Sequence, residues 1–243
     1  MYWLFTPVHE AIHGTIRGAD RRLTWLNDLV GWVGGMIAIV PFRAEARLHF
    51  LHHRYTNDPK RDPDFSIAAR APVEIALRCL MQLPAYVHHF VHGDWSGTPQ
   101  RRRDRWIGVL HLVVALALLL LSFPLGFALE LVALWLLPAM LGVALVAFVF
   151  DWLVHQPYRD TAPLQATKVV LGRGLLAAPL TAFCLWQNYH LVHHLFPGIP
   201  CHRLGRAYAR MRPHLEALGA RPHYVGPALG GGGNTLHPSL GGR

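Results

Sequence analysis

Two long apolar runs occupy the middle of the chain, at residues 107–122 and 129–150. A helix that crosses a membrane needs roughly 20 predominantly apolar residues. The second run meets that length, and the first meets it when Trp106 and Phe123 are included. The short break FPLG, at 123–126, lies between the two runs. The pattern therefore predicts an antiparallel transmembrane hairpin.

Basic residues stand at both open ends of this hairpin and are missing from its turn. The sequence RRRDR at 101–105 precedes the first run, and Arg159, Lys168 and Arg173 follow the second. Because loops rich in Lys and Arg stay on the cytoplasmic side, both open ends are predicted to face the cytoplasm.

The weaker apolar segments leave more than one interpretation open. Residues 23–40 contain Asn27 and Asp28 as well as three glycines, so a weak span and an interfacial or re-entrant helix are both compatible with them. Residues 165–186 are interrupted by charges and Pro179, and they predict a buried or interfacial helix. We expect a membrane domain over 1–212, followed by a basic, Gly-rich, disordered tail over 213–243.

The composition agrees with a membrane protein. Apolar residues make up 52% of the chain and charged residues only 15%, against roughly 25% charged in soluble proteins. The formal charge of +9 suits nucleic acid or anionic lipid headgroups. Since the arginines flank apolar segments, we favour the membrane and predict no nucleic-acid partner.

Histidines form three short clusters, HEAIH at 9–13, HFLHH at 49–53 and HLVHH at 190–194. On a helix, positions i, i+3 and i+4 share one face, so each cluster presents two or three imidazoles to one side. A further histidine follows the hairpin in DWLVH. The candidate metal ligands are His9, His13, His49, His52, His53, His155, His190, His193 and His194.

The hairpin indicates that these clusters converge. Two crossings lie between His53 and His190, an even number, so the second and third clusters emerge on the same side. The first cluster joins them if residues 23–40 do not cross, and the polar pair Asn27-Asp28 argues that they do not.

The number of histidines constrains the metal chemistry. HExxH is the zinc-protease signature, but such a site uses three protein ligands around one ion. Nine histidines suffice for two ions with four or five imidazoles each. Imidazole suits Zn, Cu, Fe and Ni alike. A site beside a lipid-filled cavity suggests oxidation of C–H bonds, which needs a redox metal that activates O₂.

Several stretches resemble one known family. The three clusters, with LHFLHHRYTNDPKRDPD at 48–64, FDWLVHQPYRD at 150–160 and NYHLVHHLFPGIP at 188–200, are similar to the membrane fatty acid desaturase superfamily, over about residues 1–212. The likeness is greatest to its bacterial desaturases and carotenoid ring hydroxylases. It implies an all-α integral membrane enzyme of the bacterial inner membrane, in which a cytoplasmic helical cap holds two iron ions and O₂ is the co-substrate.

The chain departs from the family pattern at two points. Where the family often has an asparagine four residues before the extra histidine, this chain has Asp151 before His155. Asp151 is therefore expected either to ligate directly or to orient His155. The family also usually has one or two membrane helices before the first cluster, whereas His9 lies close to Met1. Either the start is truncated or the protein is unusually small.

Acidic residues near the clusters are candidates to orient the ligands, because metal-bound histidines usually donate their second N–H to a carboxylate or carbonyl. In the turn NDPKRDPD we expect this role for Asp58 and Asp62 before Asp64, against the alternative of an ordinary solvated turn. Glu10 is expected to partner the metal site rather than act as a protease base. A separate cluster of His88, His89 and His92 is interpreted as a solvated interfacial face.

The resemblance implies an activity in which hydrogen is removed from a substrate methylene and either a double bond or a hydroxyl results. An acyl-lipid desaturase is our leading prediction, and a carotenoid β-ionone ring hydroxylase is the alternative. A membrane zinc hydrolase built on HEAIH and a metal transporter are alternatives of different classes.

Electrons must come from outside, because the chain has no Gly-rich nucleotide motif and no haem or iron–sulfur cysteine pattern. A ferredoxin or cytochrome is implied. A basic surface could dock such an acidic carrier or bind anionic headgroups equally well. Its residues are Arg203, Arg206, Arg210 and Arg212.

Overall fold

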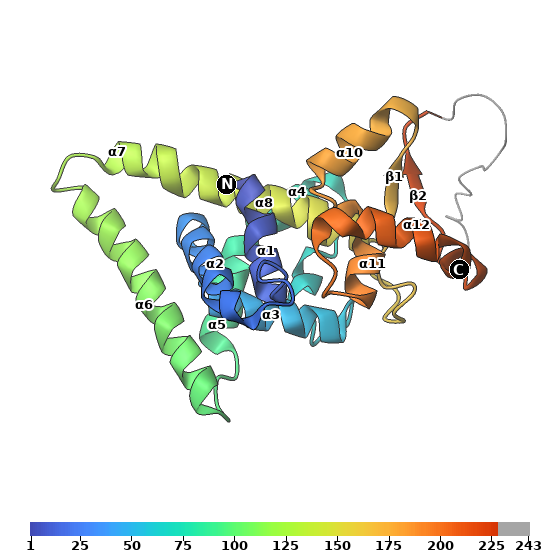
Figure 1. The fold of residues 1–243 in the computed structure, drawn as a ribbon. Helices are drawn as coiled ribbons and strands as arrows, with labels where there is room; N and C mark the ends of the chain where they lie inside the picture. Colours follow the sequence, from blue (N-terminus) through green and yellow to red (C-terminus); the bar gives the residue numbers. More distant parts are fainter. Residues whose placement is uncertain (228–243) are drawn as a thin grey trace.

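The computed structural model describes residues 1–227 of the 243, and these residues are predominantly helical (Figure 1). The predicted all-helical class is confirmed, with one small exception. Strands β1 (Val170–Gly172) and β2 (His223–Val225) pair in parallel, with Val170 opposite His223.

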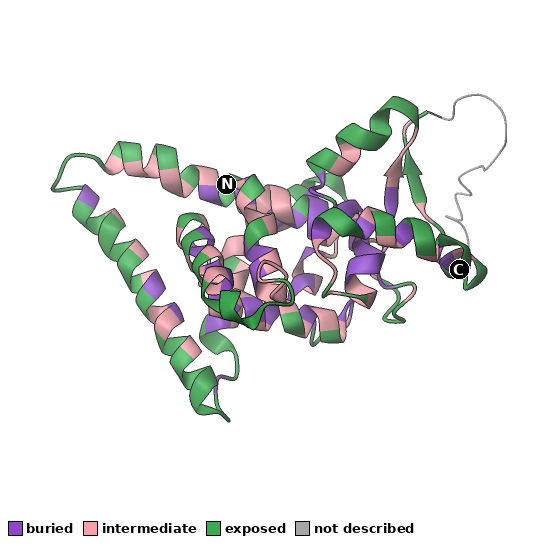
Figure 2. Ribbon diagram, viewed as in Figure 1, coloured by how far each residue is buried: buried purple, intermediate pink, exposed green. Residues whose placement is uncertain are grey.

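The predicted hairpin is confirmed by two helices that are long and apolar enough to cross a membrane. The first is α6 (Pro99–Ser122), and the second is a continuous helical rod over Ala128–His155. The rod comprises α7 (Ala128–Leu131), the π-helical η4 (Val132–Leu136), α8 (Leu137–Val146), the π-helical η5 (Ala147–Trp152) and α9 (Leu153–His155). In the most apolar stretches of the two helices only 17% and 28% of the residues are buried (Figure 2). Such a continuous exposed apolar surface is expected where lipid is the solvent.

The first 55 residues fold back on themselves. This part contains the helices α1 (Phe5–His13), α2 (Thr24–Ala38) and α3 (Phe42–Tyr55). The 3₁₀ turn η1 (Tyr2–Leu4) precedes α1, and η2 (Arg21–Leu23) precedes α2. The segment Arg21–Ala38 meets α3 at 97°. Asn27 donates from Nδ2 to the carbonyl of Ala11 at 2.7 Å, and a Cβ on Gly34 would lie 2.4 Å from Val8. Close packing and this amide bond hold α2 against α1.

This arrangement is compatible with the re-entrant interpretation of residues 23–40. His13 at the end of α1 and His49 in α3 lie side by side, with their Nε2 atoms 2.8 Å apart. The segment between them therefore leaves and returns to one place, as the polar pair Asn27-Asp28 had suggested. Asp28 forms an ion pair with Arg43 at 2.9 Å.

The remaining elements lie toward the open end of the hairpin (Figure 1). They are η3 (Pro63–Ile67), α4 (Pro72–Leu80), α5 (Gln82–His92), η6 (Gly174–Leu176), α10 (Ala177–Phe183), η7 (Gln187–Tyr189), α11 (His190–Leu195) and α12 (Cys201–Ala217). Val169, Val192 and Leu204 form the centre of one apolar core between them and are at most 1% exposed.

Two sequence expectations need correction here. Residues 165–186 do not form one helix: the first part contains β1, and only Ala177–Phe183 is α-helical. The boundary expected at residue 212 falls inside α12, and ordered chain continues past it to β2, with Leu215 buried in the core. The rest of the predicted tail, 228–243, lies outside the described residues.

Candidate metal centre

Four separate helices bring the nine predicted histidines together. Helix α1 supplies two, α3 three, α11 three, and α9 supplies His155 at the end of the second apolar helix. They form two adjacent groups, and within each group the candidate ligand atoms lie within 4.8 Å of one another. Group one is His9, His13, His49, His53 and His193, and group two is His52, His155, His190 and His194.

The ring nitrogens of group one point at each other. The Nε2 of His49 lies 2.8 Å from that of His13 and 2.9 Å from that of His53, which in turn is 3.0 Å from the Nε2 of His193. His9 packs against His193 with ring centroids 4.5 Å apart.

In group two the ring nitrogens also lie close to one another, and the group contacts group one. The Nε2 of His194 lies 3.0 Å from that of His190 and 3.3 Å from that of His52. His155 is 2% exposed, and neither of its ring nitrogens has a hydrogen-bond partner within the described part of the chain. His53 and His194 stack with centroids 4.2 Å apart, which joins the two groups.

Hydrogen bonding alone does not account for this geometry. A neutral imidazole has one N–H, so an Nε2 either donates one bond or accepts. The Nε2 atoms of His49 and His53 each face two other Nε2 atoms within about 3 Å. An ion that binds imidazole at about 2.1 Å, with neighbouring ligands about 90° apart, separates their nitrogens by about 3 Å. The donor set therefore fits metal ions, and an all-imidazole set suits iron, zinc, copper and nickel.

Burial sets the charge state of these rings. It lowers the pKa of His9 and of His193 well below the usual range, with neighbouring histidines adding to the effect. Burial also lowers the pKa of His13 to about 4. These imidazoles are neutral at neutral pH, which is the form that ligates a metal.

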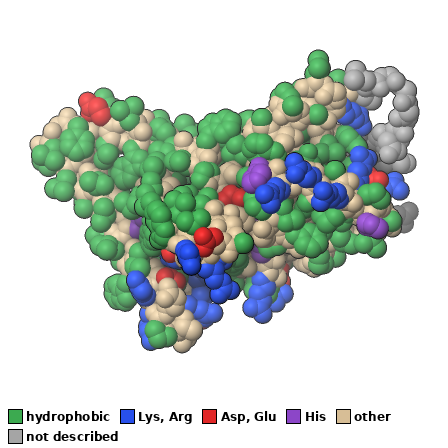
Figure 3. All heavy atoms as spheres, in the orientation of Figure 1, with side chains coloured by type: hydrophobic (Ala, Val, Ile, Leu, Met, Phe, Trp, Pro, Cys, Tyr) green, Lys and Arg blue, Asp and Glu red, His purple; other side chains and the backbone are tan. Residues whose placement is uncertain are grey.

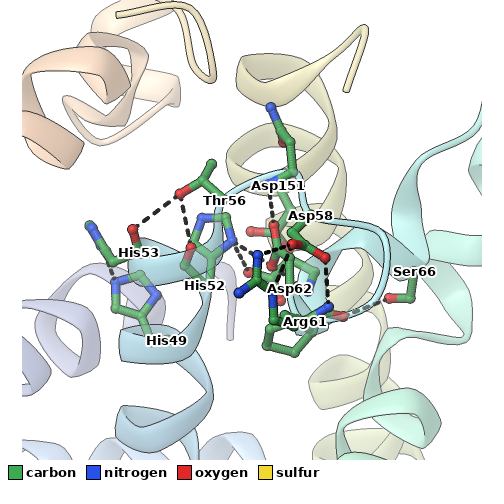
Figure 4. A network of polar contacts seen from close by, with 12 residues as sticks. His49, His52, His53, Thr56, Asp58, Arg61, Asp62, Ser66 and Asp151 are labelled. Atoms are coloured by element: carbon green, nitrogen blue, oxygen red, sulfur yellow. Dashed lines mark hydrogen bonds and ion pairs between the residues drawn. The ribbon is translucent and has the colours of Figure 1, made fainter. Parts of the chain in front are cut away.

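The turn after α3 contacts His52 on the Nδ1 side of its ring (Figure 4). The Nδ1 of His52 donates to Oδ1 of Asp62 at 2.9 Å and lies 3.2 Å from Oδ2 of Asp64. Asp62 also accepts from the backbone N–H of Asn57 at 2.7 Å. Asn57 has a left-handed φ of 63°, which Asn tolerates better than most residues. The expected role of Asp62 as an orienting partner agrees with this geometry.

The sequence analysis expected Asp58 to orient a histidine before Asp64, but it is Asp64 that lies beside His52. Asp58 pairs with Arg61 at 2.5 Å on the surface, so it does not orient a histidine. Asp64 is 4% exposed and accepts a hydrogen bond from the Tyr86 hydroxyl at 2.7 Å. Burial raises the pKa of Asp64 to about 6, although the nearby His52 acts in the opposite direction.

Glu10 has a different place from the one expected. Its Oε2 accepts from the hydroxyl of Thr15 at 2.8 Å and from the backbone N–H of Cys201 at 3.2 Å. Glu10 thereby ties the end of α1 to the start of α12 rather than partnering a histidine. Asp151, in η5, lines a cavity beside the histidines and does not belong to either group.

Three polar residues near the groups escaped the sequence analysis. Thr56 Oγ1 lies 3.3 Å from Nδ1 of His194, and the Gln187 amide lies 3.4 Å from Nδ1 of His9. Tyr86, on α5, reaches the site through Asp64. Thr56 and Gln187 each lie within three residues of a cluster of candidate ligands, which is the signal that could have identified them, whereas Tyr86 adjoins only the cluster at 88–92 that was interpreted as solvated.

A largely apolar cavity of about 880 Å³, its mouth included, opens beside the histidines. Its apolar wall includes Val8 and Ile12 of α1 and Val143 of α8. His9, His49, His52 and His190 line the same space.

The predicted basic surface lies on α12, where arginine side chains gather on the outside (Figure 3). Arg203, Arg206 and Arg210 are exposed and border a shallow surface groove. Arg212 is engaged with Glu216 at 2.7 Å. His88 and His92 lie on the exposed side of α5, as expected, whereas His89 is half-buried; all three are apart from both histidine groups.

Comparison with known proteins agrees with this arrangement. Residues 1–226 match the family model for fatty acid desaturases. The chain is 29% identical over 217 residues to an sn-1 oleoyl-lipid 12-desaturase of Picosynechococcus. This alignment covers 79% of the present chain and 61% of the relative. The chain is 26% identical over 235 residues to the dihydrorhizobitoxine desaturase of Bradyrhizobium elkanii, covering 84% and 62%.

A β-carotene ketolase of Paracoccus is 29% identical over 205 residues, covering 84% of this chain and 72% of the ketolase. The chain thus spans about three fifths of the length of the two desaturases and somewhat more of the ketolase. A match of the family model along nearly the whole described chain, together with the nine converging histidines, establishes that the chain belongs to the fatty acid desaturase family.

Proposed function

We propose that this protein is an O₂-dependent di-iron oxidoreductase that desaturates the acyl chain of a membrane lipid. The observation that carries the proposal is the pair of adjacent all-imidazole groups opening onto an apolar cavity. A hydrolytic zinc site needs three protein ligands and a water, which leaves most of these histidines unexplained.

Group one and group two would each hold one iron ion. Bound there, the iron pair would supply the activation of O₂ and the removal of hydrogen from an unactivated C–H bond. The chain's own residues contribute position and exclusion of water. Asp62 fixes the ring of His52, and the carboxylate keeps that ring's Nδ1–H pointing away from group two.

The cavity walls would orient the substrate. Apolar side chains of α1 and α8, such as Val8, Val143 and Val146, would remove the apolar surface of a hydrocarbon chain from water, which is favourable. His49, His52 and His190 stand on the same wall, so a chain in the cavity passes beside both groups. Held in this way, one methylene lies closer to the centre than its neighbours do.

A carotenoid ring is the second candidate substrate, and one observation favours it. The alignment with the β-carotene ketolase covers more of that relative's length than the alignments with the two desaturases cover of theirs. Hydroxylation of a β-ionone ring, the alternative raised by the sequence, belongs to the same class of C–H oxidation.

The electrons would come from a separate acidic carrier of the ferredoxin or cytochrome type. Arg203, Arg206 and Arg210 on α12 offer a basic surface for it. The arginines at 101–105 support an inner-membrane location with the metal centre on the cytoplasmic face.

A direct test expresses the full chain in cells and profiles lipids and pigments by mass. We expect a product that forms only with O₂ and a reductant: a loss of two mass units in acyl chains for desaturation, or a gain of oxygen on a carotenoid ring for the second candidate. Stoichiometric zinc with O₂-independent hydrolysis would instead support the hydrolase and overturn the proposal.

A further inference from the structure

One end of the cavity is polar, although an unsubstituted hydrocarbon chain neither donates nor accepts hydrogen bonds. Its apolar side comes from α1, α2 and α8. The other side comes from α3, η3, α5 and η5 and carries three carboxyl groups, an amide and a phenol. These residues are Glu45, Asp64, Asp151, Gln82 and Tyr86.

Two polar atoms at this end are buried without a partner. Gln82 is 2% exposed, and its Nε2 has no hydrogen-bond partner among residues 1–227, while its Oε1 accepts from Ser66 at 3.3 Å. The Oε2 of Glu45 is likewise unpaired within that range. An unsatisfied buried polar group costs about 1–3 kcal/mol. A ligand group that supplied the missing partner would remove this cost.

The carboxyl groups have one explanation that needs no ligand. Two metal ions bound by neutral imidazoles carry a large positive charge, and carboxylates such as Asp62 and Asp64 beside His52 would balance it. This argument does not extend to Gln82, because an amide is neutral. The unpaired amide therefore needs a reason of its own.

The polar end is close to the metal centre rather than at a remote mouth. Tyr86 donates to Asp64 at 2.7 Å, and Asp64 lies 3.2 Å from the Nδ1 of His52. Glu45 is one helical turn before His49 on α3. A substrate group bound here would therefore lie near the carbon that is oxidised.

The chemistry of the lining limits what that group can be. The lining contains neither Lys nor Arg, so a phosphate or a carboxylate of an anionic headgroup would find no cationic partner at this end. The amide N–H donates and the Glu45 oxygen faces the same space, so a group that both accepts and donates fits them. A hydroxyl has this property.

We propose that the polar end formed by Glu45, Gln82 and Tyr86 is a subsite for a hydroxyl group, so that the preferred substrate is an already hydroxylated acyl chain or ring. This inference rests on the proposed function in one respect, namely that the cavity holds the substrate. It places the enzyme after a reaction of the hydroxylating class.

The test measures binding without turnover. The metal-loaded full chain is kept anaerobic and without reductant, and dissociation constants are measured for matched ligands. One arm compares methyl stearate with methyl hydroxystearates whose hydroxyl is moved along the chain. The other compares β-carotene with its 3-hydroxylated ring counterpart. A gain in either arm identifies the source of the hydroxyl.

We expect one hydroxylated ligand to bind about tenfold more tightly than its unsubstituted partner, the effect of one well-placed hydrogen bond. Gln82→Leu should abolish that preference and leave the metal content unchanged. Gln100→Leu, on the exposed start of α6, is the matched control and should retain the preference. If the leucine variant fails to fold, the near-isosteric Gln82→Met replaces it.

Equal affinity for both members of every pair would overturn the subsite, as would a preference that survives the loss of the Gln82 amide. Neither result depends on catalysis. A chain that binds the hydroxylated ligand selectively but yields no oxidised product would contradict the proposed function instead, so the two failures are distinguishable.

Discussion

In the hairpin, leucines face outward, whereas in the metal centre histidines and carboxylates face inward. Leu116 and Leu129 are 55% and 78% exposed, while His9, His193 and Asp64 are 1%, 1% and 4% exposed. Each arrangement would be unfavourable for a soluble protein without ligands. Each becomes favourable with a partner absent from the protein itself, lipid around the hairpin and metal ions inside the centre.

The largest expected effect comes from removing a buried imidazole. His193→Ala deletes a member of group one that faces His53 at 3.0 Å, so we expect loss of bound metal and activity together, by more than about 100-fold. His88→Ala, on the exposed face of α5, is the control and should change neither. Metal content and product formation are measured on the same preparations. The reverse pattern would contradict the assignment of group one.

The next largest effect tests whether lipid surrounds the hairpin. Leu116→Arg places a charge near the middle of the apolar run 107–122 in α6, where insertion into lipid becomes less favourable by about 3–4 kcal/mol. Leu218→Arg is a matched control, since Leu218 is similarly exposed, at 63%, but follows α12. The fraction of protein recovered in membranes should fall for the first variant and stay constant for the second. An equal fall in membrane recovery for both variants would contradict the assignment of α6 as a lipid-facing helix.

A smaller effect concerns the group that orients His52. Asp62→Asn keeps the shape but weakens the acceptor for the ring N–H, and metal affinity should fall about 10–100-fold. Asp58→Asn alters the surface pair with Arg61 and should leave the affinity unchanged. Titration with a competing chelator measures both. A loss on Asp58→Asn that matches the loss on Asp62→Asn would show that the contacts with His52 are irrelevant.

The smallest effect is expected at Thr56. Its hydroxyl lies 3.3 Å from Nδ1 of His194 and also donates to the carbonyl of His52. Thr56→Val should weaken metal binding by about 1 kcal/mol, roughly fivefold. The exposed Thr24 donates to the carbonyl of Arg21, so Thr24→Val serves as the control in the same titration. An unchanged affinity for Thr56→Val would mean that His194 needs no such support.

The convergence of the histidines could be predicted because it depends on local rules. Spacing of three and four residues aligns imidazoles on one helix face. An even number of apolar runs between His53 and His190 returns the chain to the same side. The two groups of five and four rings agree with the expected capacity for two ions. Their role as iron ligands stays a prediction.

The features that the sequence could not predict depend on distant partners. Strand β1 exists because residues 223–225 pair with it, far along the chain. Asp64 reaches His52 while Asp58 pairs with Arg61 at the surface, in a turn that begins at the left-handed Asn57. Tyr86 contributes through a separate helix, and no periodicity within α5 indicates that contact.

The number and surroundings of the bound ions test the central claim most directly. The purified full chain should hold two iron ions, and X-ray absorption should report nitrogen neighbours at about 2.1 Å, the distance expected for imidazole. His193→Ala should reduce the number of nitrogen neighbours, and His88→Ala should not. A single ion per chain, or ions whose nearest neighbours are unaffected by His193→Ala, would contradict the binuclear histidine centre.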